Sequence, residues 1–264
     1  MSDSENKIHY TESFNTALQW IWGDGYLSPG GAEEVAEMLR DISVRDRAIL
    51  DIGSGLGAID ILLAETHGAR SVLGIDVEPQ LIEHASRRAA AADLAQRVRF
   101  QLVEPGPLPF TDGSFDIVFS KDAIIHIADK SAFYAEVLRV LEPGGVFIGS
   151  DWLCGDKETH TEQALAWLEF IDLNFAMKNL VETRQALEQA GFEQVRLKDR
   201  NEWYRTEIKN ELASLAGDNY AKLVRLVGAE QAAHRLKSST LKQQAIEDGF
   251  LRPTHFVGYK PAAR

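Results

Sequence analysis

A glycine-rich turn that directly follows an apolar run at residues 48–52 constrains the fold of this chain more than any other feature. Gly53, Gly55 and Gly57 occupy every second position of the turn, and a stretch of helix-forming composition begins at Ala58. Strand, glycine turn and helix follow in this order where a doubly wound sheet brings its backbone close to a nucleoside-bearing ligand. Side chains at the glycines would block that approach, and the turn needs φ values that glycine reaches freely.

A second apolar run, at residues 71–75, ends in Asp76. A carboxylate at this place in a doubly wound sheet can accept hydrogen bonds from both hydroxyls of a ribose. The glycine interval differs from the G-x-G-x-x-G fingerprint of dinucleotide-binding enzymes, and no second nucleotide motif is present. A dehydrogenase is therefore disfavoured. The plainer alternative is a glycine turn that only joins a strand to a helix.

Apolar and helix-forming segments alternate over residues 31–150, which predicts an α/β fold with a doubly wound, Rossmann-like and mostly parallel sheet. We expect strands near 47–52, 71–76, 98–103, 116–120 and 145–150, and helices near 32–41, 58–67, 79–94 and 131–141. The pattern changes after residue 151. There we expect helix over about 160–190 and 206–245, and strands near 194–198 and 254–260.

This organisation predicts three regions. Residues 1–30 form an N-terminal helical lid, because Trp20, Trp22 and their neighbours are too apolar for a free tail. Residues 31–150 form the ligand-binding core. Residues 151–264 form a helical cover over an acceptor pocket and supply the closing strands of the same domain.

Composition and charge narrow the classes of partner. The net charge of −12, with no cluster of Lys and Arg longer than a dipeptide, argues against nucleic acid. A single cysteine excludes an internal disulfide and a zinc cluster, so we expect no metal. No apolar run reaches the roughly 20 residues that span a bilayer, and no signal peptide precedes the first motif. These observations predict a cytoplasmic enzyme without a membrane, whose partner is a small molecule; the oligomeric state stays open.

The turn D-x-G-x-G-x-G at residues 51–57 resembles that of class I S-adenosylmethionine-dependent methyltransferases. Segments 108–120, 121–126 and 141–149 follow in the order of that family. The lid, with Tyr10 and the run Tyr26-Leu-Ser-x-Gly-Gly, is similar to that of phosphoethanolamine N-methyltransferases. This resemblance covers about residues 1–150 and is weak beyond 155.

The resemblance implies S-adenosyl-L-methionine as cofactor. It carries cofactor-binding roles onto Tyr26, Ser28, Asp51, Gly53, Gly55, Asp76, Val77, Glu104, Pro105 and Lys121. Glu104 stands where the family has an aspartate that accepts from the adenine amino group. Pro105 has no backbone N–H, so a family contact to adenine through that amide is lost here.

The same resemblance implies catalytic roles for Tyr10, His126 and Asp122. An alkylammonium, with a pKa of about 10, must lose a proton before its nitrogen can attack a methylsulfonium. His126 could act as the general base, Tyr10 could hold His126 and seal the site, and Asp122 could orient the amine. The plainer alternatives are a core or surface histidine, a packing aromatic and an aspartate that caps the following helix.

The phosphate-binding residues of that family are replaced by apolar ones. Leu18, Trp152, Leu173 and Phe175 stand where the family has charged or hydroxyl-bearing side chains. Apolar side chains give no charge-assisted donors to a dianion. We therefore expect negligible activity on phosphoethanolamine and better activity on a compact neutral or cationic amine.

Aromatic side chains around Trp152 and Phe175 could stabilise an alkylammonium, or could simply fill the core. The favoured interpretation is an N-methyltransferase that acts on a small unphosphorylated amine or amino acid. The alternatives are an S- or C-methyltransferase that acts on a small apolar acceptor, and a cofactor-binding protein without catalysis.

Overall fold

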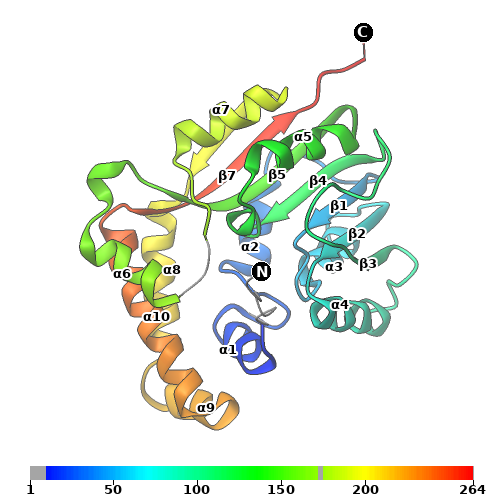
Figure 1. Ribbon diagram of the computed structural model, residues 1–264. Coiled ribbons are helices and arrows are strands. Elements are labelled where there is room, and N and C mark those ends of the chain that lie inside the picture. Colours follow the sequence, from blue (N-terminus) through cyan, green and yellow to red (C-terminus); the bar gives the residue numbers. More distant parts are fainter. Residues whose placement is uncertain (1–9, 172–174, 264) are drawn as a thin grey trace, which may run out of the picture.

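The computed structural model describes residues 10–171 and 175–263. A seven-stranded sheet, with the strand order β3-β2-β1-β4-β5-β7-β6, runs through the molecule (Figure 1). Its strands are β1 (Ala48–Ile52), β2 (Ser71–Asp76), β3 (Val98–Leu102), β4 (Phe115–Lys121), β5 (Leu141–Cys154), β6 (Glu193–Asp199) and β7 (Leu251–Tyr259). The pairings among β1 to β5 are parallel, and β7 pairs antiparallel with both β5 and β6. The predicted mostly parallel, doubly wound sheet is confirmed.

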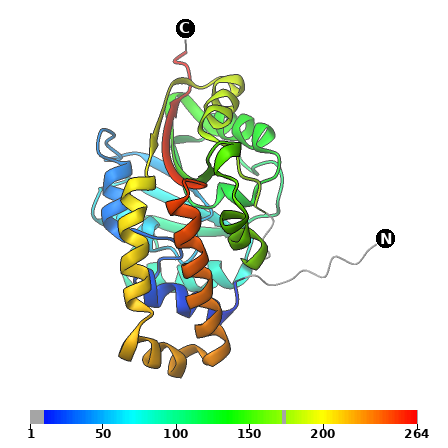
Figure 2. The same cartoon turned by 90° about the vertical axis from the view of Figure 1, so that its left-hand side faces the viewer.

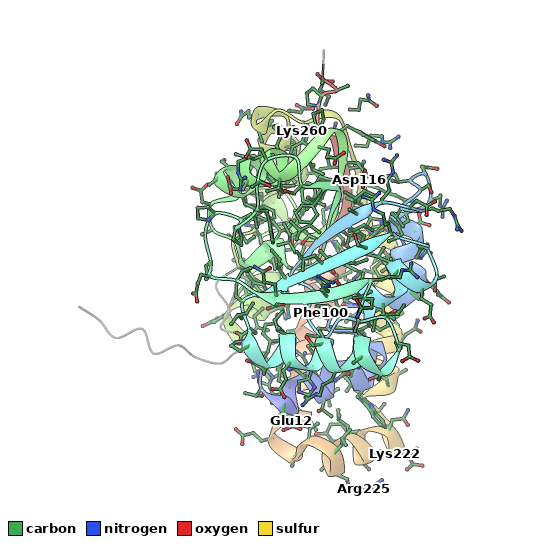
Figure 3. All side chains as sticks on the ribbon, turned by 90° about the vertical axis from the view of Figure 1, so that its right-hand side faces the viewer. Glu12, Phe100, Asp116, Lys222, Arg225 and Lys260 are labelled. Carbon is green, nitrogen blue, oxygen red and sulfur yellow. The ribbon has the colours of Figure 1, made fainter. Side chains whose placement is uncertain are left out.

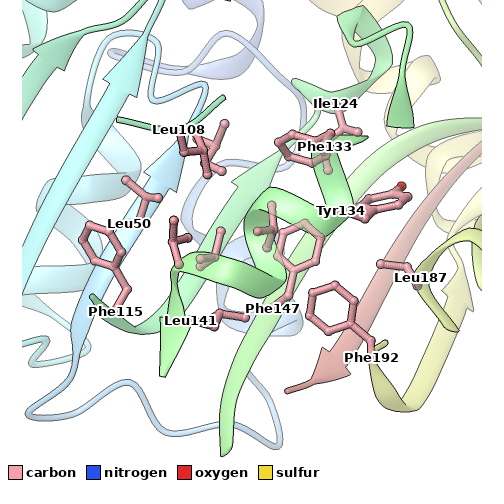
Figure 4. Close-up of a cluster of buried hydrophobic side chains, with 14 of the residues drawn as sticks. Leu50, Leu108, Phe115, Ile124, Phe133, Tyr134, Leu141, Phe147, Leu187 and Phe192 are labelled. Atoms are coloured by element: carbon pink, nitrogen blue, oxygen red, sulfur yellow. The ribbon is translucent and has the colours of Figure 1, made fainter. Parts of the chain in front are cut away.

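Two hydrophobic layers cover the two faces of the sheet. Successive residues of a strand point to opposite faces, so Leu50 packs on one layer while Ile49 packs on the other. The first layer holds α5 (Lys130–Val140) and α7 (Leu180–Ala190); its aromatic centre around Phe147 is shown in Figure 4. The second layer holds α2 (Gly31–Met38), α3 (Ala58–Glu65) and α4 (Pro79–Ala91).

The remaining helices form a cap below the sheet, in which α8 and α10 run side by side and α9 crosses their far end (Figure 2). They are α1 (Glu12–Trp22), α6 (Glu162–Ile171), α8 (Asn201–Ser214), α9 (Gly217–Val227) and α10 (Ala229–Glu247), with the short helices η1 (Ile124–His126) and η2 (Lys157–Thr159). Ala17 of α1 packs with Leu215, Leu223 and Ala232 from the C-terminal helices. The N-terminal helix and the C-terminal helices thus share one apolar cluster.

The cap differs from the sequence prediction in its divisions. The stretch expected to be helical over about 160–190 is divided into α6 and α7, and the stretch over about 206–245 into α8, α9 and α10. Gly228, with φ +86°, separates α9 from α10 in a conformation that only glycine adopts without strain. Lys222 and Arg225 of α9 lie at the opposite end of the molecule from Lys260 (Figure 3).

Within residues 10–171 and 175–263, no helix combines the length and the apolar character that crossing a bilayer requires. The same residues contain no group of three or more His, Cys, Asp or Glu side chains placed to hold a metal ion.

Candidate functional site

The glycine turn lies between β1 and α3, and its three glycines all have positive φ, at +79°, +55° and +80°. A Cβ atom at Gly53 would lie 2.3 Å from Cβ of Ala123, and one at Gly57 would lie 2.6 Å from Cζ of Phe100. Phe100 lies on the edge strand β3, above α4 (Figure 3). The turn therefore excludes side chains for two reasons, its backbone conformation and its close packing. The turn lies at the carboxyl end of the parallel strands, the edge at which doubly wound sheets bind their ligands.

Asp76, the last residue of β2, holds this turn in place. Its carboxylate accepts hydrogen bonds from the backbone N–H of Gly55 at 3.0 Å and of Glu78 at 3.1 Å. Burial raises the pKa of Asp76, although these backbone N–H groups favour the ionised form. The structure thus places the predicted ribose-binding carboxylate directly beside the glycine turn.

Asp51, on β1, is only 2% exposed. Burial raises its pKa to about 7, and the charge of Asp76 adds to this effect. Burial also raises the pKa of Asp60, and the charge of Asp51 adds to this effect. Two buried carboxyl groups, one on the sheet and one on α3, therefore have raised pKa values beside the glycine turn.

Three further predicted cofactor residues lie where β2 and β3 end. Asp76 and Leu102 are partners in the parallel pairing of these strands, so the residues that follow them share one edge of the sheet. Val77 is 49% exposed, and Glu104 and Pro105 are also exposed. Val77 and Pro105 thus present apolar surface near the carboxylate of Glu104.

Lys121, Ser28 and Asp122 connect the lid to the end of β4. The Nζ atom of Lys121 donates to Oγ of Ser28 at 2.8 Å, to the Pro29 carbonyl at 2.9 Å and to Oδ2 of Asp122 at 2.6 Å. Tyr26, on the same lid segment, is half-buried, and burial raises the pKa of its hydroxyl. The lid residues therefore meet the core at Lys121.

Asp122 has φ +59°, an unusual conformation for a residue other than glycine. Its Oδ1 accepts from Oγ of Ser150 at 2.9 Å and its Oδ2 from Lys121. No side chain caps η1, so Asp122 does not play the helix-capping role that was its plainer alternative. Backbone strain held by surrounding bonds is characteristic of functional sites.

Tyr10 and His126 meet across the lid. The Tyr10 hydroxyl lies 3.4 Å from Nε2 of His126, and the rings are 6.5 Å apart at 74°. Burial and the charges of Asp76 and Glu78 raise the pKa of Tyr10 to about 12, so its hydroxyl keeps its proton at neutral pH. Tyr10 is thus within the electrostatic reach of the ribose-binding candidate and within contact of the candidate base.

The predicted substrate residues lie on the cap side of His126. Leu18 and Trp152 are buried, at 3% and 8% exposure. The Phe175 ring lies 5.2 Å from that of His126 at an edge-to-face angle of 70°. The Trp152 ring lies 5.0 Å from that of Tyr204. Leu173 lies outside the described residues.

Three other cations of the C-terminal half are held by partners of their own. Arg200 forms an ion pair with Glu34 at 2.7 Å. Arg205 donates to the side chain of Asn201 and to the Glu247 carbonyl. Lys237 is exposed over the ring of Phe170.

Two cations that sequence reasoning missed are buried at this end of the site. Arg235 and Lys242, both on α10, are 8% and 5% exposed. Their seven-residue spacing, with small residues at 238, 239 and 245 between and beyond them, places both on one face of a helix. From the sequence, this spacing could have indicated that the two cations share a covered face of the helix.

A groove of about 550 Å³ lies between α2 and α8. Its lining includes Trp22 and Glu211, which both contact Lys242.

Comparison with known proteins gives one family and several relatives. A model of a methyltransferase domain matches residues 43–213. Phosphoethanolamine N-methyltransferase 1 of Zea mays is 30% identical over 208 residues, which cover 78% of this chain and 40% of the relative. Phosphoethanolamine N-methyltransferase of Triticum aestivum is 28% identical over 256 residues, 97% of this chain and 49% of the relative. The chain thus spans less than half the length of these plant relatives.

Among solved structures, Haemonchus contortus phosphoethanolamine N-methyltransferase 2, in complex with phosphomonomethylethanolamine and S-adenosylhomocysteine, superposes with a TM-score of 0.88. The match covers 97% of this chain and 59% of that one at 24% identity, and it shows that the two share a fold.

Proposed function

The chain belongs to the methyltransferase domain family, and on this premise we propose that it transfers a methyl group from S-adenosyl-L-methionine to the nitrogen of a small amine or amino acid. The observation that carries the proposal is the contact between Tyr10 and His126 at 3.4 Å. This contact lies within the electrostatic reach of Asp76, at the edge where the glycine turn lies. A candidate base is therefore next to the candidate cofactor site.

The residues around the turn fit a nucleoside with a charged tail. Asp76 can accept from both ribose hydroxyls, and the exposed Val77 offers an apolar face to a purine ring. We assign the adenine end to Glu104 and Pro105, and the opposite end to Asp51, Gly53, Gly55 and the lid residues Tyr26, Ser28 and Lys121. The cofactor, when bound, supplies a methyl group on a positively charged sulfur.

His126 would remove the proton from the acceptor ammonium, because a neutral imidazole can act as a general base at neutral pH. The Tyr10 hydroxyl contacts Nε2 of His126 and would hold the ring in place; it donates to Nε2 in one tautomer of the neutral ring and accepts from Nε2–H in the other. Asp122, held by Lys121 and Ser150, would fix the direction of the acceptor nitrogen. Alignment matters because methyl transfer is an in-line displacement.

The relatives named above methylate the nitrogen of a phosphorylated amine, as their names state. For this chain we propose an unphosphorylated acceptor, because Leu18 and Trp152 place buried apolar surface on the acceptor side. Apolar side chains supply no hydrogen-bond donors, and burying a dianion against them costs several kcal/mol unless neighbouring cations supply the donors.

A panel of amines, amino acids, thioethers and isoprenoid-like acceptors, each incubated with labelled S-adenosylmethionine, tests the proposal. We expect label on the nitrogen of an amine or amino acid, identified by mass spectrometry, and negligible label on phosphoethanolamine. Label on sulfur or carbon alone would replace N-methylation with the other transfer chemistry. Binding of the cofactor with no product from any acceptor class would favour a non-catalytic cofactor-binding protein.

A further inference from the structure

Four polar side chains of α8 and α10 form a buried group that the proposed chemistry does not use. We call Tyr204, Glu211, Arg235 and Lys242 the cap charge cluster; α8 and α10 carry it side by side in Figure 2. Glu211 is its only carboxylate. It forms an ion pair with Nζ of Lys242 at 2.8 Å and accepts hydrogen bonds from Tyr204 and, at 2.9 Å, from Nε1 of Trp22.

Lys242 is further held by aromatic rings. Its Nζ lies 5.1 Å from the ring centre of Trp22, 5.3 Å from that of Tyr204 and 5.6 Å from that of Trp152. These distances are in the range of cation–π attraction. The Trp152 face that could have received a ligand ammonium is therefore next to a cation of the protein itself.

Arg235 has no comparable charge partner. Its Nη2 donates a hydrogen bond to the neutral hydroxyl of Ser238 at 3.0 Å, and its guanidinium lies 5.3 Å from the ring centre of Phe14. Its Nε has no hydrogen-bond partner, and no described carboxylate lies within ion-pairing distance of it. A guanidinium cannot lose its proton in a protein, so the cluster holds two cations against one carboxylate.

The surplus positive charge lies near the proposed reaction site. The Arg235 guanidinium lies 5.3 Å from the ring centre of Phe14, the Phe14 ring lies 5.7 Å from that of Tyr10, and Tyr10 contacts His126. The charge of Asp122 in turn acts on the pKa of both Tyr204 and Lys242. The cap charge cluster therefore lies near both His126, the candidate base, and Asp122, the carboxylate proposed to orient the amine.

We propose that the methyl acceptor carries a single carboxylate that Arg235 binds, so that the acceptor is a small amino acid. This inference rests on the proposed N-methylation and names its substrate class. A planar guanidinium with a free Nε–H can bind a carboxylate through two parallel hydrogen bonds. A monoanion neutralises the surplus charge of the cluster, whereas a phosphate dianion would reverse it. The amino group of the same molecule would face His126 and Asp122.

S-adenosylmethionine also carries a carboxylate, so the experiment must distinguish binding of Arg235 to the acceptor from binding of Arg235 to the cofactor. Matched probes are glycine with 2-aminoethanol, and N-methylglycine with N-methylaminoethanol, in which a hydroxymethyl group replaces the carboxylate. Binding is measured by calorimetry on the full chain saturated with S-adenosylhomocysteine, and turnover with labelled S-adenosylmethionine. We expect the wild-type protein to favour the carboxylate member of each pair by about 100-fold.

Arg235→Met should remove this preference and leave the affinity for S-adenosylhomocysteine unchanged. Lys237→Met, an exposed substitution on the same helix, is the matched control and should keep the preference. Because Arg235→Met removes an unpaired buried cation, the melting temperature of the ligand-free protein should rise, while the stabilisation by glycine is lost. An arginine with only a structural role would give a lower melting temperature and an unchanged preference.

Three outcomes would overturn the inference. A loss of affinity for S-adenosylhomocysteine in Arg235→Met would assign Arg235 to the carboxylate of the cofactor. Equal binding of both members of each pair by the wild-type protein would show that no acidic group is recognised. Methylation of neutral amines but of no amino acid would support the proposed N-methylation and contradict an amino acid as the acceptor. Conversely, Arg235-dependent binding of amino acids without product would support the site and contradict N-methylation.

Discussion

The hydroxyl oxygen of Tyr10 lies 3.4 Å from Nε2 of His126, although 116 positions separate the two residues in the chain. Tyr10 precedes α1, and Ala17 of α1 packs against Leu223 and Ala232 of the C-terminal helices. His126 ends η1, directly beyond β4. The contact therefore depends on the cap as a whole, because the cap positions the lid over the end of the sheet.

Substitution of His126 tests its role as general base. His126→Ala should lower turnover about 100-fold, the typical contribution of a positioned base, with cofactor affinity unchanged. His84→Ala, on an exposed histidine of α4, is the control. Steady-state kinetics across pH 6–9 would measure both. Wild-type rates for His126→Ala over that whole range would contradict the assignment.

Tyr10→Phe keeps the ring of the lid and removes only the hydroxyl. We expect a smaller fall in turnover than for His126→Ala, because the packing of Tyr10 on Phe14, at 5.7 Å between ring centres, remains. The acid limb of the pH–rate profile should shift, since the hydroxyl no longer contacts His126. An unchanged profile would restrict Tyr10 to packing.

Asp76→Ala should weaken S-adenosylmethionine and S-adenosylhomocysteine alike. The substitution removes the acceptor proposed for two ribose hydroxyls and leaves the N–H of Gly55 without its bond, a loss of about 1–3 kcal/mol. Calorimetric titration measures it, with the exposed Asp218→Ala as the control. Tight binding of NAD with none of either adenosyl ligand would refute the cofactor assignment.

Gly53 and Gly144 offer a matched pair, because both have φ +79°. An alanine at either position meets the same backbone penalty, of about 1–2 kcal/mol. Only at 53 would the added methyl meet Cβ of Ala123 at 2.3 Å; at 144 nothing lies within 4 Å. Urea unfolding should show a larger loss for Gly53→Ala than for Gly144→Ala, and only Gly53→Ala should lose cofactor binding. Equal losses would show that close packing at the turn is unimportant.

Acid should weaken the junction of α2 with β7 and α8. Burial opposes ionisation of Glu34, but hydrogen bonds from His255 and Arg200 outweigh it and lower its pKa to about 2 from the ordinary value of 4.5. A depressed pKa contributes stability that is complete above pH 4.5 and is lost as the pH falls toward 2. That contribution is about 3 kcal/mol at pH 7 and about 1 kcal/mol at pH 3.

Urea unfolding of the wild type and of Glu34→Gln at pH 7 and pH 3 measures this change. The difference in unfolding free energy between the two proteins should shrink at the lower pH. The exposed neighbour Glu33 gives the control substitution Glu33→Gln, which should show no such trend. A difference that stays constant with pH would mean that the ion pairs of Glu34 add nothing to stability.

The amino-acid sequence was sufficient to predict the core of the sheet and its glycine turn. Each of these depends on residues close together in the chain: alternating apolar segments predict strands and helices, and a turn with glycines at 53, 55 and 57 has few conformations open to it. Strand β2 ends at Asp76 as expected, and α4 begins at Pro79. The approach of the turn to Asp76 follows from the parallel pairing of two adjacent strands.

The tertiary structure alone decided which distant residues share the acceptor end of the site. Strand β7 enters the sheet between β5 and β6, and it closes the fold where α10 ends. Arg235 and Lys242 are charged residues in a predicted helix, and charged residues of a helix face water unless other elements cover them. Packing of α1 and α8 against α10 buries both cations. Their burial and their shortage of carboxylates arise from contacts far apart in the chain, which no local pattern specifies.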